Sequence, residues 1–430
     1  MDQSQYKQVV LSQINNDEII ELATGLAQFQ SFSDHERDCA MWVANYLRER
    51  DVEVTVQEVE PGRPNVIATI PGDGTGASLM FNGHLDVDPL TEGYKHDPWK
   101  IEVRDGKLWG HGLANMKAGV ASMIHAALAV KRSQVRLKGS IVVACVIGEL
   151  QCGVGSEHLS RNGPLTDLAI VPEPSNMNVR TTHSGNVIVL IRVRGTSGWI
   201  GAMHRYTTVN AVDKMANVIA ALRELKFATP RDPLLPGVPR HLIGSIIGGL
   251  GGEGGEPNLS RPSYVPDNCM ITLEVRMPPG MTMESAIVDI EKILDRVRAT
   301  DSDLDVELLK PPAAYRRPWR SGPFVHPAMK LPLGHPLEGL VVSNYREIMG
   351  SDPLKVGAED PGSYGCTDAG HLAQVGVKAL VFGCTANLWG ESFVELKNLF
   401  AHSRILAACA ADVVSTERAR WVGPLRPNQN

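Results

Sequence analysis

Hydrophobic positions along the first third of the chain switch between the period of a helix and that of a strand. Residues 18–29 and 116–130 carry apolar side chains at helical spacing, whereas residues 52–59 alternate like a half-buried strand. Short apolar runs predict further strands at 66–70, 78–81 and 138–147. Strands that alternate with helices in this way are typical of an α/β domain with a largely parallel sheet.

Polar residues mark the expected starts of two helices. Asn16 and Asp17 precede the first helical pattern, where their side chains can accept hydrogen bonds from the first backbone amides. Ser33 and Glu36 have the spacing of a capping box ahead of a helix that reaches Leu47. We therefore expect Ser33 and Glu36 to satisfy the start of that helix.

A second pattern begins near residue 184. Strands are predicted at 186–195, 269–277 and 304–309, with helices at 210–225 and 283–299. This β-α-β-β-α-β-like order indicates a small domain inserted into the larger one. The Gly-rich segment 248–255 is predicted to be a loop and the Pro-rich segment 310–318 a return hinge. The predicted domains are therefore residues 1–183 and 313–430 together, with residues 184–312 inserted between them.

The composition changes this picture little but limits the partners. The 430 residues carry 42 Lys and Arg against 48 Asp and Glu, a net charge of −6, without a basic cluster. Nucleic acid and anionic membranes are therefore not expected as partners. The start of the chain lacks the pattern of a secretory signal, and the seven cysteines are scattered without a CxxC pair. We expect a cytoplasmic protein with reduced thiols.

Residues that can carry chemistry follow several predicted strands. His84 and Asp86 lie two residues apart after an apolar strand, so Asp86 could orient His84 through its second ring nitrogen. Glu149 and Glu173 each follow another buried strand, and residues 110–119 form a turn that enters a helix. Residues just past the carboxyl ends of strands meet at one crevice in an open α/β sheet. A lone histidine at a strand end is more often structural, but these segments together predict one site.

The ordered motifs also resemble a known family over nearly the whole chain. They are RPNV at 63–66, GHLDV at 83–87, HDPW at 96–99, WGHGLANMKAG at 109–119, VPEPSN at 171–176, VPDNC at 265–269, EVRMPPGM at 274–281 and CTDAG at 366–370. The chain resembles the zinc-dependent amidohydrolases and exopeptidases that include aminoacylase, acetylornithine deacetylase and succinyl-diaminopimelate desuccinylase. The resemblance implies an α/β, mixed-sheet metallohydrolase catalytic domain, phosphorylase/hydrolase-like, with an inserted α+β ferredoxin-like lid domain that mediates dimerisation.

The resemblance implies a dinuclear metal site, of which this sequence keeps only part. His84 and Glu173 match two ligands, and Asp86 matches the residue that orients the histidine. The bridging aspartate of the family falls on Asn115, and a ligating glutamate falls on Leu150, which cannot bind a metal. One subsite is therefore degraded.

A third departure lies near the C-terminus, where the family's histidine ligand falls at about Glu391. His402, eleven residues further on in a helical pattern, is expected to be a satisfied helix histidine instead. We predict one divalent ion per subunit, Mn, Zn or Fe, bound by His84, Asn115, Glu173 and Glu391. The alternative is that the losses abolish metal binding altogether.

Further roles come from the same resemblance. It implies metal-assisted hydrolysis in which Glu149 is the general base. Asp86 is assigned to the catalytic residues as well, because it orients His84. A family histidine that reaches a partner subunit's site falls on Trp199, so His204 is assigned that substrate-binding role, with an exposed loop histidine as the alternative. Arg276 matches the arginine that binds a substrate carboxylate, although a strand arginine paired with a local acid is equally consistent.

The predicted function is a metal-dependent hydrolase that cleaves a C–N bond in a small carboxylated substrate. Because the metal set is incomplete, a specialised reaction is as credible as ordinary peptidase or deacylase activity; one example is removal of an aromatic amine, as in the divergent relative nitroanthranilate aminohydrolase. A conventional N-acyl amino acid deacylase, a dipeptidase and a carboxypeptidase are alternatives. A binding protein that has lost its metal is a further alternative from another class. We expect a homodimer or a higher homo-oligomer formed through the inserted domain.

Overall fold

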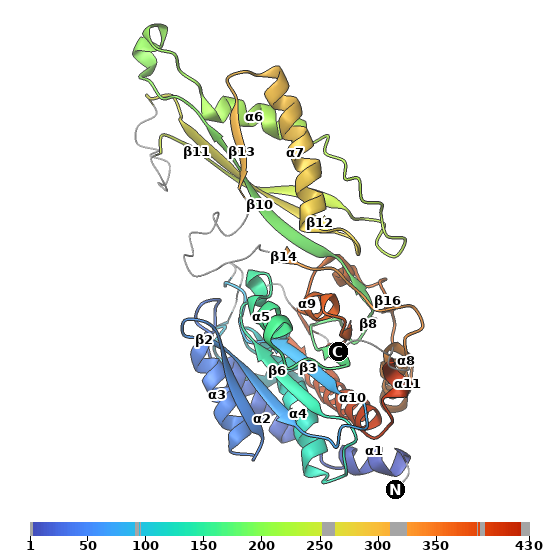
Figure 1. Ribbon diagram of the computed structural model, residues 1–430. Helices are drawn as coiled ribbons and strands as arrows, with labels where there is room; N and C mark the ends of the chain where they lie inside the picture. Colours follow the sequence, from blue (N-terminus) through green and yellow to red (C-terminus); the bar gives the residue numbers. More distant parts are fainter. Residues whose placement is uncertain are drawn as a thin grey trace. The chain divides into compact units, whose positions relative to one another are not determined.

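The computed structural model describes residues 3–90, 94, 96–251, 263–309, 325–384, 386–387 and 392–422. The chain divides into two compact units (Figure 1). Unit 1 comprises residues 1–183 and 329–430, and unit 2 comprises residues 184–328. The second boundary predicted from the sequence, at 312/313, lies outside the described residues.

Unit 1 is built on an eight-stranded sheet with the order β1-β2-β6-β3-β7-β17-β8-β16. Its strands are β1 (Glu53–Glu60), β2 (Arg63–Ile70), β3 (Leu79–His84), β6 (Ile141–Val146), β7 (Leu168–Val171), β8 (Val179–Arg180), β16 (Val356–Gly357) and β17 (Lys378–Val381). The four central strands β6, β3, β7 and β17 are mutually parallel, whereas β1, β2 and β6 pair antiparallel. The predicted α/β fold with a mixed sheet is confirmed.

Helices cover both faces of this sheet. They are α1 (Gln3–Leu11), α2 (Asn16–Ala27), α3 (Arg37–Arg48), α4 (Ala118–Arg132), α5 (Val154–Asn162), α8 (Pro336–Met349), α9 (Ala369–Gln374), α10 (Leu396–Val414) and α11 (Ala419–Val422). On β3, Leu79 and Phe81 belong to the hydrophobic cluster that contains α2, α4 and α10, whereas Met80 packs in a cluster with Leu159 of α5 and Leu372 of α9. The alternation of side chains along a strand therefore produces two separate cores.

Short strands complete unit 1. β4 (Glu102–Arg104), β5 (Lys107–Trp109), β18 (Ala386–Asn387) and β19 (Phe393–Glu395) form a small antiparallel sheet, and β9 (Thr182–His183) pairs with β15 (Met329–Lys330). A π-helical turn, Leu113–Lys117, runs directly into α4. The combined helix Leu113–Arg132 is long and apolar enough to cross a membrane, but 94% of its most apolar window is buried inside unit 1. It is the central core helix of that unit.

The predicted capping box at Ser33 and Glu36 is wrong. Helix α3 begins after Glu36, which makes no side-chain bond to the helix start. The Glu36 carboxylate instead binds Arg63, and the Ser33 hydroxyl donates to Asp86 Oδ2 at 3.3 Å. Tertiary partners far along the chain therefore take both polar side chains away from the helix end.

Unit 2 has the β-α-β-β-α-β order that the sequence predicts. Its elements are β10 (Gly185–Arg194), α6 (Ala211–Leu222), β11 (Arg240–Gly249), β12 (Asn268–Met277), α7 (Met283–Thr300), β13 (Asp305–Leu309) and β14 (Val325–His326). The sheet order β11-β12-β10-β13 is that of a ferredoxin-like fold. Gly248 and Gly249, predicted to start a loop, are the end of β11, a strand that the hydrophobic pattern did not locate.

Candidate metal centre

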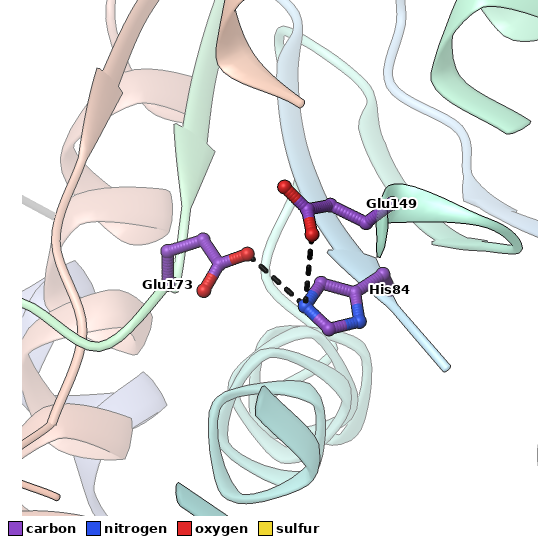
Figure 2. Close-up of side chains that lie close together, drawn as sticks. All are labelled: His84, Glu149 and Glu173. Carbon is purple, nitrogen blue, oxygen red and sulfur yellow. Dashed lines mark ion pairs between the residues drawn. The ribbon is translucent and has the colours of Figure 1, made fainter. Parts of the chain in front are cut away.

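Three neighbouring parallel strands bring the predicted site residues to one edge of the sheet. His84 ends β3, Glu149 follows β6 in a 3-10 turn (Glu149–Gln151), and Glu173 follows β7. Because β6 and β7 flank β3, the carboxyl ends of all three strands lie together. Figure 2 shows the two carboxylates directed at the imidazole from either side, Glu149 from its turn and Glu173 from a loop.

The three side chains are buried and in contact. The Nε2 atom of His84 lies 3.1 Å from Glu173 Oε1 and 4.0 Å from Glu149 Oε2. One ligand atom from each residue falls within 4.8 Å of the others, close enough to share an ion. Within the described part of the chain, this is the one group of His, Cys, Asp and Glu side chains with that spacing.

Asn115 joins the same point from the π-helical turn that precedes α4. Its Oδ1 lies 3.2 Å from His84 Nε2, and its Nδ2 donates to Asp88 Oδ2 at 3.2 Å. The bond to Asp88 turns the amide so that its oxygen, the atom able to ligate a metal, faces His84. The sequence predicted Asn115 as part of the site, and the structure places it there.

The hydrogen bonds of His84 fix which ring nitrogen faces the carboxylates. Nδ1 lies 2.9 Å from the backbone oxygen of Asp86, which can only accept, so Nδ1 carries the proton. In the neutral ring, Nε2 then presents a lone pair toward the acceptor atoms of Asn115, Glu149 and Glu173. An imidazole nitrogen, two carboxylates and an amide oxygen directed at one point fit a divalent transition-metal ion.

Asp86 holds more than the histidine. Its carboxylate accepts hydrogen bonds from the backbone amides of Glu149 at 3.1 Å and Leu150 at 3.0 Å, while its Oδ1 lies 3.5 Å from His84 Nδ1. His84 Nδ1 donates its main hydrogen bond to the backbone oxygen of Asp86, and not to the carboxylate that the sequence suggested. The Asp86 carboxylate therefore positions the turn that carries Glu149 as well as the imidazole.

Electrostatics in the site follow from burial and from crowded carboxylates. Burial acts to lower the pKa of His84, but Glu173 and Asp86 outweigh it and hold that pKa well above its usual value. Burial raises the pKa of Glu149 well above its usual range, and Glu173 and Asp368 raise it further. Burial also acts to raise the pKa of Asp86, yet the bonds from His84 and the two amides hold it below its usual value. The site therefore favours an added positive charge.

Sequence reasoning missed one acidic residue of this region. Asp368, at the start of α9, is buried, and neither carboxylate oxygen makes a hydrogen bond of normal geometry within the described residues. Burial raises its pKa to about 7, with His84 acting to lower it and Glu173 and Asp86 to raise it. The available signal was the CTDAG motif at 366–370, where the carboxylate directly precedes a helix.

The other predicted site residues lie elsewhere. Glu391 lies outside the described residues. His402, on α10, is a buried helix histidine as expected, but it is only half satisfied: its Nε2 lies 3.0 Å from the backbone oxygen of Phe382, whereas its Nδ1 has no hydrogen-bond partner within the described residues. In unit 2, His204 is exposed and accepts a bond from Arg205, and Arg276 lies 2.7 Å from Glu274. The substrate-binding roles of His204 and Arg276 stay predictions.

Comparison with known proteins identifies the family of this chain. A family profile, Peptidase family M20/M25/M40, matches residues 80–412. The chain belongs to this family. The resemblance read from the motifs is thereby confirmed, and so is the prediction of a metal-dependent hydrolase that acts on C–N bonds.

Two sequence relatives and one solved structure are similar to this chain. The N-formyl-4-amino-5-aminomethyl-2-methylpyrimidine deformylase of Bacillus subtilis is 26% identical over 415 residues, 89% of this chain and 91% of the relative. The succinyl-diaminopimelate desuccinylase of Methylobacterium radiotolerans is 29% identical over 315 residues, 70% and 78% of the two chains. A dinuclear metal-binding M20 peptidase of Bacillus subtilis superposes with a TM-score of 0.62 at 14% identity, covering 93% of this chain and 99% of that structure. This structural similarity supports the fold of the present chain and nothing beyond it.

Proposed function

We propose that this M20 protein hydrolyses the bond between a small acyl group and the amino nitrogen of a small molecule. The observation that carries the proposal is the convergence of His84 Nε2, Glu149 and Glu173 at one buried point. The deformylase and the desuccinylase support the substrate class, because both names describe removal of an acyl group from nitrogen.

Each residue has a role that its contacts allow. His84, Glu173 and Asn115 would hold a divalent ion, which when bound polarises the electrophile and lowers the pKa of water. Glu149, 4.0 Å from His84 Nε2, is near enough to take a proton at the same point and pass it to the leaving nitrogen. Asp86 keeps the Glu149 turn in place through two backbone amides.

We further propose that the site holds a single ion. Position 150 is a leucine whose backbone amide binds Asp86, so the second ligand of a glutamate pair is missing. Asn115 is neutral and cannot balance the charge of two cations as a bridging carboxylate does. The buried carboxylates Glu149 and Glu173 suit one ion.

Metal analysis tests the count. Protein purified without chelator or added metal should contain about one Mn, Zn or Fe per chain, and His84→Ala should lose it. Inductively coupled plasma mass spectrometry of both proteins gives the ratio directly. Two ions per chain would refute the single-ion site. An absence of metal even after incubation with Mn²⁺ or Zn²⁺ would favour a binding protein that has lost its metal.

A second candidate reaction follows from the neutral side chain at Asn115. A site with one ion gives less charge stabilisation than a dinuclear one, and an aromatic ring with an electron-withdrawing group needs less of it when water displaces its amine. A substrate panel separates the two reactions. Release of formate, acetate or succinate from N-acyl compounds supports acyl removal, whereas ammonia released from 5-nitroanthranilate supports the aromatic aminohydrolase.

We also propose that two copies associate through unit 2. Within the described residues β11 forms one edge of its sheet, and Leu242, Ile246 and Ile247 on it are 65%, 54% and 49% exposed. An exposed apolar edge strand is a ready surface for pairing, and two identical strands can pair antiparallel about a twofold axis. The occupant of this edge is therefore a second copy of the chain.

A charge on this edge should separate the copies. In analytical ultracentrifugation we expect the wild type to sediment as a dimer and Leu242→Lys as a monomer. Leu333→Lys is the matched control, because Leu333 in unit 1 is 98% exposed and its replacement should leave the dimer intact. The assignment of this edge would be contradicted if both variants dissociated equally, or if neither dissociated.

A further inference from the structure

The loop that carries Glu149 has a shape that needs external support. Between β6 and α5 it curls so tightly that Gly148 and Gly153 take positive φ angles of 66° and 68°, and Cys152 one of 62°. The amide of Gly153 closes back on the backbone oxygens of Gly148 and Glu149, each at 3.0 Å. Cys152 is strained in that conformation because it has a Cβ.

Asn65 of β2 ties both ends of this loop to the sheet. Its Oδ1 accepts from the amide of Ile147 at 3.1 Å, and its Nδ2 donates to the backbone oxygen of Gly155 at 2.9 Å. Asn65 is fully buried, and a Cβ on Gly155 would lie 2.6 Å from Asn65 Oδ1. The amide side chain thus fills the space that the missing Cβ leaves and bridges the loop ends.

Arg63, two residues earlier on the same strand, supports the loop from a second direction. Its guanidinium is buried, pairs with Glu36 and Glu60, and lies 3.0 Å from Asp34 Oδ1. A Cβ on Gly148 would lie 3.2 Å from Arg63 Nη2, so the guanidinium packs directly against the residue before Glu149.

A hydrogen-bonded chain connects this arginine to the far end of the turn. Asp34 Oδ1, which binds Arg63, also accepts from Gln151 Nε2 at 3.2 Å. On the side that faces the site, the Asp86 carboxylate accepts hydrogen bonds from the backbone amides of Glu149 and Leu150. The turn is therefore held between Asp86 within the site and the Arg63 network behind it.

We propose that Arg63 and Asn65 of the RPNV motif are positioning residues for Glu149, a role that rests on the proposed function of Glu149 as general base. Neither residue touches His84 or Glu173 in the contacts described above, so the metal ligands stay in place when the loop loosens. A small displacement of a catalytic group is enough to cost a large factor in rate. The motif therefore acts on turnover and not on metal binding.

The test compares three variants of the full chain. Asn65→Ala removes both loop-end bonds, and Gln151→Met removes only the bond to Asp34, as a milder change in case Asn65→Ala fails to fold. Asn344→Ala is the control, because Asn344 is also a buried amide of unit 1 but binds Leu340 and Asp412 on α8 and α10. Hydrogen exchange of residues 147–155, Mn²⁺ titration calorimetry and steady-state kinetics are measured for each.

For Asn65→Ala we expect loop amides to exchange at least about tenfold faster, kcat to fall about 10- to 100-fold, and KM and the Mn²⁺ Kd to change little. Gln151→Met should change the exchange rate and kcat in the same direction but by a smaller factor. Asn344→Ala should change neither. Unchanged loop exchange, faster exchange with unchanged kcat, or a loss of Mn²⁺ affinity parallel to kcat would overturn the proposal. If the wild type turns over none of the panel, the proposed function fails, and the exchange data alone still decide whether Asn65 holds the loop.

Discussion

Glu149→Gln is expected to lower kcat by about 10²–10⁴-fold while the protein keeps its fold and its metal. Glutamine has the same shape but cannot accept and pass on a proton, so the loss reports the general base alone. His84, Asn115 and Glu173, the proposed ligands, are unchanged in this variant and should still hold the ion. Burial and the neighbouring Glu173 and Asp368 disfavour a charge at position 149, so a neutral amide there should not lower the thermal midpoint.

Glu173→Gln is the matched control for this prediction. It is also a glutamate beside His84, at 3.1 Å, but its proposed role is ligation, so its replacement should weaken Mn²⁺ binding together with turnover. Activity and metal content measured on the same preparations distinguish the two roles. Activity of Glu149→Gln within tenfold of the wild type would show that another group takes the proton, and loss of metal would make Glu149 a ligand.

The convergence of the site could be predicted because it follows from strand geometry. His84, Glu149 and Glu173 each follow a buried strand, and the carboxyl ends of neighbouring parallel strands share one edge of the sheet. The order of the strands is not visible in the sequence, but hydrophobic runs and the position of polar residues after them are. The motifs of the resemblance then supplied a role for each side chain.

The parts that escaped prediction depend on partners far apart in the chain. Glu36 has the spacing of a helix cap, yet Arg63, 27 residues away, binds its carboxylate. Asn65 reaches residues 82 and 90 positions further on, so the function of its motif could not be read locally. Strand β11 was missed because its exposed apolar residues and glycines do not alternate as in a half-buried strand. Local patterns therefore predict elements better than the side-chain networks that join them.

A buried acid outside the proposed ligand set should contribute to the pH response of the metal-free protein. Asp368 has a pKa raised to about 7, against 3.8 for an ordinary aspartate, chiefly through burial. The folded chain therefore keeps a proton there that the unfolded chain releases between about pH 4 and pH 7. Stability consequently falls as the pH rises through this window, because the folded state must then bury a charge.

Asp368→Asn removes this contribution. We expect the free energy of unfolding of the variant, relative to the wild type, to rise by about 2–4 kcal/mol between pH 4 and pH 8, measured by urea unfolding in EDTA. The charged groups around the carboxylate are His84, Glu173, Asp86 and Glu149, and taking the difference between two proteins cancels most of their own titration.

Asp360→Asn is the control for a buried aspartate whose charge is paired. Asp360 binds Arg180 at 3.2 Å and Asn178 at 2.8 Å, so its replacement leaves a buried guanidinium without its counter-charge and should destabilise the protein at both pH values. A difference for Asp368→Asn that does not change with pH would contradict the buried, protonated carboxyl. A fall with rising pH would mean that the Asp368 charge is stabilising in the folded state, as it would be with an unseen cationic partner.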